Sequence, residues 1–451
     1  MSGAPPSAPL AAPAPTQLRR CLGPVAVTAQ AVATVGLTLT AVINIPAAAQ
    51  AAGRATWIAC GIALVAVLLV SETLVLFRRE PAQASGIAGY VGVGLGARAG
   101  ALASWALLLG YGASALACLA FLGFYLCRLV AHLGLPLLPA VGFLAGGLAC
   151  LEMTRRDVRL STGTMLFTEG LSVLIVLGLC LVVLRHGGSA ADLEALNPSG
   201  DQFTQVRAGL MVAVLSFLGF ESAANLGTEA LRPERAVPRA LRTAVLLSGV
   251  LFLFWAVVLT EGLGWLPLAE RTGLDPISLL ADRLGQTGAG RWIEIGAFLC
   301  LFGSSLGSLT ALGRVGFSLA ERGVLPRRLA AIHPGSQTPS TALLALGLPV
   351  ISLGTLLVLR GLSAHTLFEL LGGFAVLGFL LVYGLVAIAS LRTPLTGSTL
   401  RRRVLVSGTC LVAVLAVAVA YLGSLVGQQN DLLLSFVGLM GVGSVLVGRR
   451  L

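Results

Sequence analysis

Several acidic residues lie inside long apolar segments, and two of them, Glu221 and Glu169, are the candidates for chemistry. Glu221 lies in the segment 206–230 and Glu169 in the segment 162–184. An ionisable residue in a segment long enough to cross a membrane is rare and usually functional. Glu221 could hold an amine, take up a proton or cap a broken helix, and we favour a structural or gating role. Glu169 could titrate or pair with another group, or it could lie near the helix end and reach interfacial water or an arginine.

Small and hydroxyl-bearing residues interrupt the apolar segments at two further places. One is Gly36-Leu37-Thr38-Leu39-Thr40 in the segment 24–50. The other is a set of serines in the segment 290–319, namely Ser304, Ser305 and Ser308. Hydroxyl groups could donate to a ligand or bind a hard cation, but they also bond to their own helix backbone. Small residues also let membrane helices pack closely, so both interpretations stay open.

Signatures of catalysis and of metal binding are missing from the sequence. There is no HExxH, and the four histidines are scattered, mostly near predicted helix ends. Gly303-Ser304-Ser305-Leu306-Gly307 matches G-x-S-x-G, but that motif needs a strand–turn–helix context that an apolar helix does not provide. The eight cysteines form no CxxC pair and are interpreted as small apolar fillers. We therefore expect no catalytic residue, no bound metal and no enzymatic activity.

The composition places these residues in a membrane protein. The chain has 451 residues, of which 56% are apolar and 11% charged, against about 45–50% and about 25% in soluble domains. A helix needs about 20 residues to cross the bilayer core, so twelve would use about 240. A soluble enzyme, a disordered chain, a disulfide scaffold and a β-barrel are thereby excluded. The prediction is an all-α membrane protein with about twelve transmembrane helices, at 24–50, 54–77, 98–130, 135–153, 162–184, 206–230, 240–264, 290–319, 341–360, 363–391, 403–425 and 429–448.

All 30 basic residues are arginine, and their distribution predicts the orientation. With these helices, 22 arginines fall on one side of the membrane and eight on the other. Because short loops rich in positive charge stay in the cytoplasm, both termini are predicted to be cytoplasmic. The protein is expected to be a multi-pass protein of the cytoplasmic (inner) membrane. The net charge of +11 is attributed to topology, and no nucleic-acid partner is expected.

The predicted helices fall into a pattern of five, five and two. The segments 24–50 and 206–230 begin on opposite sides of the membrane, and each has a weak point, at Gly36-Leu37-Thr38 and at Gly219-Phe220-Glu221. Interruptions at matching places in two halves of opposite topology indicate an inverted repeat with a site at the midplane. The expected organisation is a disordered cytoplasmic tail (1–20), a first repeat (21–200), a second repeat (201–395) and two final helices with a short cytoplasmic C-terminus (396–451).

Three stretches carry motifs whose order and spacing agree with one family. The first contains Gly219-Phe220-Glu221, then Glu229 and Val237-Pro238-Arg239-Ala240. The second runs from Arg314 to Pro326, and the third from Gly89-Tyr90 to Trp105. They resemble the G-F-E/D and N-P-x-x-x-I-P-R-A motifs, the R-x-x-x-x-M-A-R-D-G-x-L-P stretch and the start of helix 3 of the amino acid permeases of the amino acid–polyamine–organocation family. The resemblance spans about residues 24–392, with Arg232 in place of the usual asparagine. It implies a leucine-transporter-like fold, with a 5+5 inverted repeat plus two C-terminal helices.

By this resemblance, breaks in helices 1 and 6 form a substrate site. Amides freed at Gly36, Leu37 and Thr38 would bind a carboxylate, because a helix N-terminus carries a positive partial charge. Leu37 stands where the family has a small residue. Carbonyl groups of Phe217 and Leu218 would accept from a substrate ammonium. The remaining candidates for this site are Thr40, Tyr111, Gly219, Phe220 and Glu221.

Candidates for coupling and gating follow from the same resemblance. Some proton-coupled members carry a lysine on helix 5, which this lysine-free chain cannot supply, so Glu169 is the candidate for proton coupling. The candidates for a Na⁺ site, as in sodium-coupled relatives, are the helix 8 serines Ser304, Ser305 and Ser308. The expected inner gate or hinge comprises Glu229, Arg232 and Arg239. No cofactor is expected beyond H⁺ or Na⁺ as the coupling ion.

The resemblance implies a secondary active transporter that moves amino acids across the cytoplasmic membrane by alternating access. A transporter of polyamines or other organic cations is an alternative, in which Glu221 would bind the amine and the helix 1 amides would have no carboxylate to bind. A membrane sensor or accessory subunit without transport activity is another. The expected partners are a small-molecule amino acid or amine and the lipid bilayer, and the protein is expected to be a monomer or a weak homo-oligomer.

Overall fold

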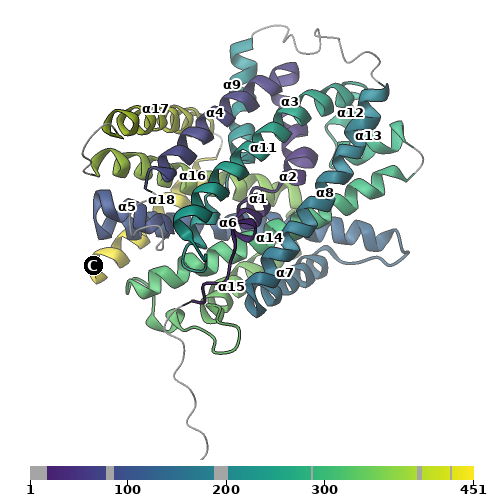
Figure 1. Ribbon diagram of the computed structural model, residues 1–451. Helices are drawn as coiled ribbons and strands as arrows, with labels where there is room; N and C mark the ends of the chain where they lie inside the picture. Colours follow the sequence, from purple (N-terminus) through teal and green to yellow (C-terminus); the bar gives the residue numbers. More distant parts are fainter. Residues whose placement is uncertain (1–17, 78–85, 187–201, 286–287, 394–398, 427–428) are drawn as a thin grey trace, which may run out of the picture.

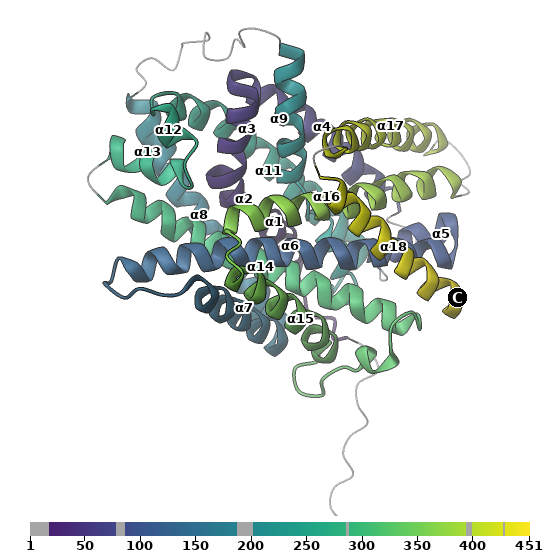
Figure 2. The ribbon, with the colours of Figure 1, turned by 180° about the vertical axis from the view of Figure 1, so that it is seen from behind.

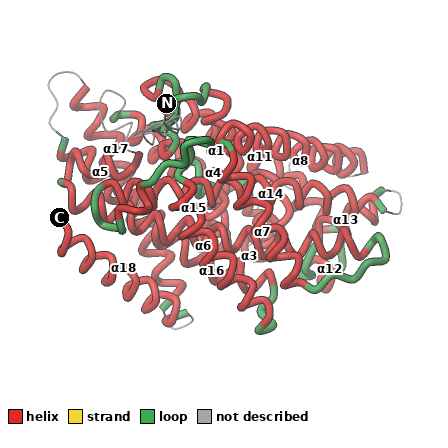
Figure 3. Tube along the Cα trace, turned by 90° about the horizontal axis from the view of Figure 1, so that it is seen from below, coloured by secondary structure: helices red, strands yellow, loops and turns green. Residues whose placement is uncertain are grey.

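The computed structural model describes residues 18–77, 86–186, 202–285, 288–393, 399–426 and 429–451 (Figure 1). Within these ranges the protein is helical and contains no strand, apart from one isolated parallel bridge between Leu22 and Ala230 (Figure 3). Most of the predicted disordered tail, residues 1–17, lies outside the described residues. Leu18, by contrast, is buried against a small apolar cluster that includes Phe317 and Ile332.

The helices follow one another along the chain, with short 3₁₀ segments at Gly53–Ala55 and Arg327–Ala330. In the first half they are α1 (Pro24–Val35), α2 (Leu37–Leu39), a π-helical segment (Thr40–Asn44), α3 (Ile45–Ala52), α4 (Thr56–Val75), α5 (Gly86–Leu95), α6 (Ala97–Ala131), α7 (Pro139–Arg156) and α8 (Val158–His186). In the second half they are α9 (Gln202–Ser216), α10 (Ser222–Asn225), α11 (Pro233–Gly264), α12 (Leu268–Arg271), α13 (Pro276–Leu284), α14 (Ala289–Glu321), α15 (Ser340–Leu359), α16 (Ala364–Arg392), α17 (Thr399–Leu425) and α18 (Asn430–Arg450).

Nine helical stretches of the described residues are long and apolar enough to cross a membrane. One of them, Pro24–Val75, contains the first two predicted helices, which are α1–α3 and α4. When Pro24–Val75 is counted as two helices, and α7 and the broken pair α9–α10 are added, the total equals the twelve predicted helices. The prediction of an all-α membrane protein is confirmed.

The structure corrects the predicted helix boundaries around the sixth and seventh helices. The segment 206–230 is interrupted where the weak point Gly219-Phe220-Glu221 was predicted, because α9 ends at Ser216 and α10 begins at Ser222, but α10 has only four residues. The seventh helix starts at Pro233 instead of near 240, since a proline fits the first helical position, where its missing N–H costs nothing. Arg239 therefore lies within α11 and not in a loop. The short helices α5, α12 and α13 were not predicted, because they lack a long apolar run.

The long helix α6 forms the centre of the molecule and packs between α14 and α16 (Figure 2). Close approach is possible because glycines face the neighbouring backbones. A Cβ atom on Gly378 would lie 2.8 Å from the carbonyl oxygen of Ala106, and one on Gly123 would lie 2.9 Å from the Cα atom of Phe143. Most of α6 and α14 is buried, whereas α17 and α18 are mostly exposed at the periphery (Figure 2). The central helices are thus the ones that can position a site.

Candidate functional site

The first transmembrane helix is broken at Gly36, in the middle of the protein. Gly36 adopts a left-handed conformation (φ 71°), and a Cβ atom there would lie 2.8 Å from the hydroxyl oxygen of Ser304. The amide of Thr40, bonded to the Gly36 carbonyl at 3.1 Å, makes the first hydrogen bond of the helix that resumes after the break. The amides of Leu37, Thr38 and Leu39 precede that bond, so they have no partner within the helix.

Glu169 of α8 and Cys300 of α14 accept hydrogen bonds from two of these three amides. The Leu37 N–H hydrogen-bonds to the Glu169 carboxyl group, and the Leu39 N–H donates to the Cys300 sulfur at 3.2 Å. The Cys300 thiol in turn donates to Glu169 Oε1 at 3.3 Å. The hydroxyl of Ser172 lies 3.3 Å from Glu169 Oε2 and accepts from Thr38 at 2.9 Å. The protein thus presents its own carboxyl group at the break.

The structure decides between the two interpretations of where Glu169 lies. Its side chain is only 3% exposed, and no arginine among the described residues pairs with it. The alternative in which Glu169 reaches interfacial water or an arginine is therefore wrong. Its part in coupling stays a prediction.

The sixth transmembrane helix, which consists of α9 and α10 and is called helix 6 below, is broken at Gly219. A second carboxyl group lies in that break. Glu221 accepts from the Tyr111 hydroxyl of α6 at 2.7 Å and from the Tyr383 hydroxyl of α16 at 2.6 Å. The Gly219 N–H also donates to it, at 3.2 Å. Asn225 donates to the Tyr111 oxygen at 3.2 Å, which extends the network along the helix. Glu221 is fully buried, and these donors supply the hydrogen bonds that its burial requires.

The two breaks touch each other through Thr34 of α1. Gly219 has φ 103°, and a Cβ atom there would lie 2.7 Å from Thr34 Cγ2 and 2.9 Å from the Thr34 carbonyl oxygen. Ser222, just after the break in helix 6, donates to the Thr34 hydroxyl at 3.0 Å. Gln30 of α1 donates to the Gly307 carbonyl of α14 at 2.8 Å. The broken helices and α14 therefore form one buried polar centre.

The surroundings of the two breaks correspond to each other. The first transmembrane helix (α1–α3) contacts α8 and α14 at its break. Among the transmembrane helices, α8 is the fifth of the first five, and α14 is the third of the second five. The sixth transmembrane helix (α9–α10) contacts α16 and α6 at its break. Here α16 is the fifth transmembrane helix of the second five, and α6 is the third of the first five. This exchange of roles is what two inverted repeats produce.

The structure does not bring all predicted site residues to the breaks. Phe217 packs on Phe252 of α11, with ring centroids 4.9 Å apart, whereas Phe220 lies 5.9 Å from Tyr383. Leu218 is buried, and the buried Thr40 hydroxyl has no hydrogen-bond partner among the described residues.

The three predicted serines of α14 also lie in different surroundings. Ser304 faces the helix 1 break at Gly36, whereas Ser308 lies 3.3 Å from Ser114 of α6. The Ser305 hydroxyl has no hydrogen-bond partner within the described part of the chain. Only Ser304 is therefore placed where a group at the helix 1 break could meet it.

One of the predicted gate residues, Glu229, has a partner that was not predicted. Glu229 forms a buried, bidentate ion pair with Arg314 of α14, with N–O distances of 2.8 Å and 3.0 Å. The Glu229 carbonyl also accepts from the amides of Cys21 and Leu22 at 2.8 Å and 2.9 Å, so it holds the chain that enters helix 1. Arg232 and Arg239 are exposed and make no ion pair within the described ranges, so Glu229 pairs with Arg314 and not with them, and their part in a gate stays a prediction.

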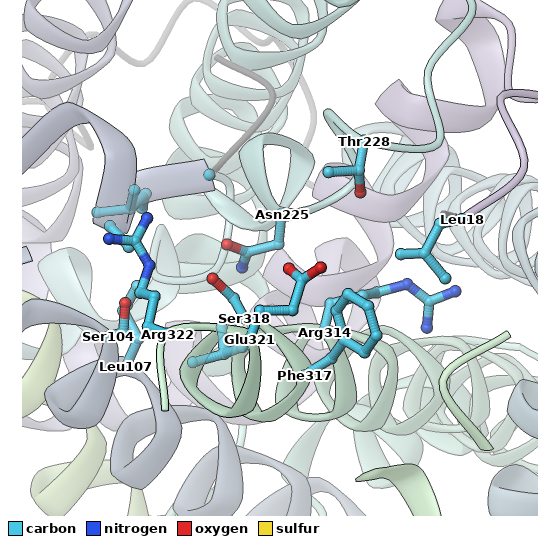
Figure 4. Close-up of a pocket in the computed structure, with 14 residues that line it drawn as sticks. Leu18, Ser104, Leu107, Asn225, Thr228, Arg314, Phe317, Ser318, Glu321 and Arg322 are labelled. Carbon is cyan, nitrogen blue, oxygen red and sulfur yellow. The ribbon is translucent and has the colours of Figure 1, made fainter. Parts of the chain in front are cut away.

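A polar cavity of about 270 Å³ lies beside this ion pair. Asn225 and Thr228 line one side, and Ser318 and Glu321 of α14 lie on the other (Figure 4). Asn225 also donates to the Tyr111 hydroxyl, which itself donates to Glu221. One residue of the cavity wall is therefore part of the hydrogen-bond network around Glu221.

Sequence reasoning missed several residues of this centre. Arg314 is the first residue of the motif that runs to Pro326, but the motif does not show that Glu229 is its partner. Tyr383 is one of only five tyrosines in the chain. This low number is the only feature of the sequence that could have drawn attention to it. Cys300 and Ser172 carried no signal, because cysteine and serine in membrane helices usually serve packing.

The fold and the two carboxyl-filled breaks define a class, the multi-pass membrane proteins with a leucine-transporter-like fold. Two solved structures support the fold. MhsT in complex with L-phenylalanine has a TM-score of 0.63 and 18% identity, and the match covers 90% of this chain and 99% of that one. A Na⁺-coupled sialic acid symporter has a TM-score of 0.56 and 15% identity, over 89% and 90% of the two chains.

The amino acid permease family matches residues 22–443, and the chain belongs to this family. Cationic amino acid transporter 4 of Homo sapiens is 28% identical over 395 residues, which cover 82% of this chain and 59% of the human protein. An uncharacterized transporter of Mycobacterium tuberculosis is 28% identical over 377 residues, covering 82% and 80%. The methylthioribose transporter of Bacillus subtilis is 31% identical over 147 residues, covering 31% of each chain.

Replacing Gly219 by alanine is expected to destabilise the protein by about 1–3 kcal/mol. The added methyl group would collide with Thr34, and the left-handed backbone disfavours any Cβ atom. Thermal unfolding in detergent measures the effect. Gly178→Ala in α8 is the matched control, because a Cβ atom there has nothing within 4 Å, and its stability should be unchanged or slightly raised. Equal stability of the two variants would contradict this account of the break.

Proposed function

We propose that this protein is a secondary active transporter that moves amino acids across the cytoplasmic membrane by alternating access. The observation that carries the proposal is the contact of two broken helices at a buried centre, with a carboxyl group at each break. Membership of the amino acid permease family supports the same conclusion. Both termini are placed in the cytoplasm, because the arginine-rich loops belong on that side.

The substrate is bound between the breaks by groups that the helices do not use themselves. Its carboxylate takes the amides of Leu37 and Leu39, where the positive end of the resumed helix favours an anion. Its ammonium takes the carbonyl groups of Phe217 and Leu218, which precede the break at Gly219. Glu221 with its two tyrosines holds helix 6 in the broken form, and Phe220 lies beside Tyr383 as a gate.

Coupling follows from competition for the helix 1 amides. The Glu169 carboxylate and a substrate carboxylate need the same donors, and both cannot bind them at once. A proton on Glu169 removes its charge and releases the amides to the substrate. Proton binding and amino acid binding then favour each other, which is the linkage that a proton symporter requires.

A second candidate is transport of amines that lack a carboxylate. The geometry at the helix 1 break favours it, because Glu169 and Cys300 already accept from the amides of Leu37 and Leu39 and would not need to leave them. In that case the substrate amine binds near Glu221. Sodium coupling at Ser304 is a further outcome that the experiment distinguishes.

Counterflow in proteoliposomes tests the function. Vesicles loaded with a mixed panel of unlabelled amino acids and polyamines receive one labelled member outside, at equal pH and without Na⁺. Accumulation of an α-amino acid in protein-containing vesicles, and not in protein-free ones, is expected. Accumulation of amines alone would replace the amino acid proposal by the second candidate, and a requirement for Na⁺ would overturn proton coupling. No accumulation by folded protein, either without Na⁺ or with equal Na⁺ on both sides, would contradict transport.

A further inference from the structure

A second polar cavity, of about 350 Å³, lies at the opposite end of the protein from the arginine-rich loops. It is formed where α3 turns into α4, at the end of α11 and at α12. Arg54 and Arg271 line it together with Glu261, and Trp57 and Trp265 contribute aromatic rings. Both signs of charge are thus present in one small cavity.

Buried polar atoms in this cavity lack partners. The Thr260 hydroxyl and the Nε atom of Arg271 are buried and form no hydrogen bond with any described residue. The Arg271 guanidinium is held in place, because Nη2 donates to the carbonyl groups of Gly264 and Leu266 at 3.1 Å and 2.9 Å. Buried donors are normally satisfied, so the cavity is suited to a ligand that brings acceptor oxygens.

An apolar groove of about 630 Å³ continues from the cavity along the bilayer-facing surface. Trp57 and Val257 line both the cavity and the groove. The groove follows α4 from Trp57 to Leu69, about 18 Å along the helix axis. That length is slightly more than half of the roughly 30 Å hydrocarbon core, the depth of one lipid leaflet.

The groove faces outward and has an aromatic residue at its mouth. Ile62 and Val65 on its floor are 45% and 60% exposed, so no other part of the described chain covers them. Leu253 of α11 and Ala413 of α17 form its flanks. Trp57 lies where the polar cavity meets the apolar groove, the position that tryptophan prefers at a membrane interface.

We propose that the cavity and the groove together bind one phospholipid whose headgroup carries both a phosphate and an ammonium. The arginines would bind the phosphate through charge-assisted hydrogen bonds. Glu261 and the tryptophan rings would bind the ammonium. One acyl chain then lies in the groove, in the leaflet opposite the arginine-rich loops. A soluble zwitterion would satisfy the cavity but leave the groove uncovered, and only a lipid matches both.

Lipid retention by the delipidated full-length protein tests the proposal. The protein in detergent is titrated with phosphatidylethanolamine and, separately, with phosphatidylglycerol, which has the phosphate but no ammonium. Native mass spectrometry counts bound lipids, and thermal unfolding verifies that each variant is folded. The wild type is expected to bind phosphatidylethanolamine at least tenfold more tightly than phosphatidylglycerol.

Three variants separate the parts of the site. Arg271→Gln should lose binding of both lipids, and Glu261→Gln should bind both equally. Gly61→Phe should fill the groove and weaken lipid binding at least tenfold, because a Cβ atom there meets only Leu253, at 3.8 Å. Gly178→Phe on the exposed face of α8 is the matched control and should bind as the wild type does.

Three results would overturn the proposal. The first is equal binding of the two lipids by the wild type, and the second is a Gly61→Phe variant that binds like its control. The third is binding of glycerophosphoethanolamine, the headgroup without acyl chains, as tightly as the whole lipid, which would make the cavity a site for a soluble solute. None of these results depends on whether the protein transports amino acids.

Discussion

Replacing Arg314 by methionine is expected to lower the free energy of unfolding by about 3–5 kcal/mol, the largest loss of stability expected of any single change here. The side chains of Arg314 and Glu229 are 3% and 1% exposed, and their two hydrogen bonds are parallel and short. Without the guanidinium, the Glu229 carboxylate stays buried and unpaired. The same residue holds the entry to helix 1, so the variant should also loosen the arginine-rich end.

The double variant Arg314→Met/Glu229→Gln provides the internal control. Removing both charges is expected to restore most of the lost stability, because the cost arises from the uncompensated charge more than from the lost attraction. Arg155→Met, which breaks the exposed pair with Glu152, is the matched surface variant and should change little. Chemical denaturation in detergent measures all three. An Arg314→Met protein as stable as the Arg155→Met protein would contradict this role for the pair.

Glu169→Gln is expected to abolish proton-driven accumulation of amino acid while leaving counterflow intact. In the wild type, raising the pH removes the proton from Glu169, and its carboxylate then competes for the helix 1 amides. Apparent affinity for the substrate should therefore fall as pH rises, by at most about tenfold per pH unit for one proton. Glutamine is neutral at every pH, so the affinity of the variant should not change with pH.

Uptake by proteoliposomes with and without a pH gradient, together with counterflow at several pH values, measures both effects. Glu234→Gln is the matched control, since this glutamate is exposed in the first turn of α11 and should not alter either property. A Glu169→Gln protein that still concentrates its substrate when driven by a pH gradient would show that another group carries the proton.

Much of the candidate site could be found in the sequence because of where its acids lie. Glu221 and Glu169 are conspicuous in apolar segments, since carboxyl groups in such segments are costly and need a reason. Gly36 and Gly219 could be singled out because glycine breaks a membrane helix and allows a left-handed backbone. Both expectations rest on local chemistry, which needs no knowledge of neighbouring helices.

The partners of these acids could not be predicted in the same way. Tyr383 lies 162 residues from Glu221 and Cys300 lies 131 residues from Glu169. A buried carboxyl group requires donors, but many hydroxyl and thiol groups in the apolar segments could have supplied them. Which ones do so depends on how α6, α14 and α16 pack, and that packing is set by small residues such as Gly378 over their whole length.

The sequence by itself determined the class of protein, the approximate helices, the two breaks and the two acids in apolar segments, but not that Glu169 is buried. These follow from composition, apolar length and residue type, because a bilayer admits only backbone that satisfies its own hydrogen bonds. Only the tertiary structure decided that Glu169 fills the helix 1 amides, that Arg314 and not Arg232 pairs with Glu229, and that a polar cavity opens into an apolar groove at Trp57. These features join residues far apart in the chain, and their geometry exists only once the helices have packed.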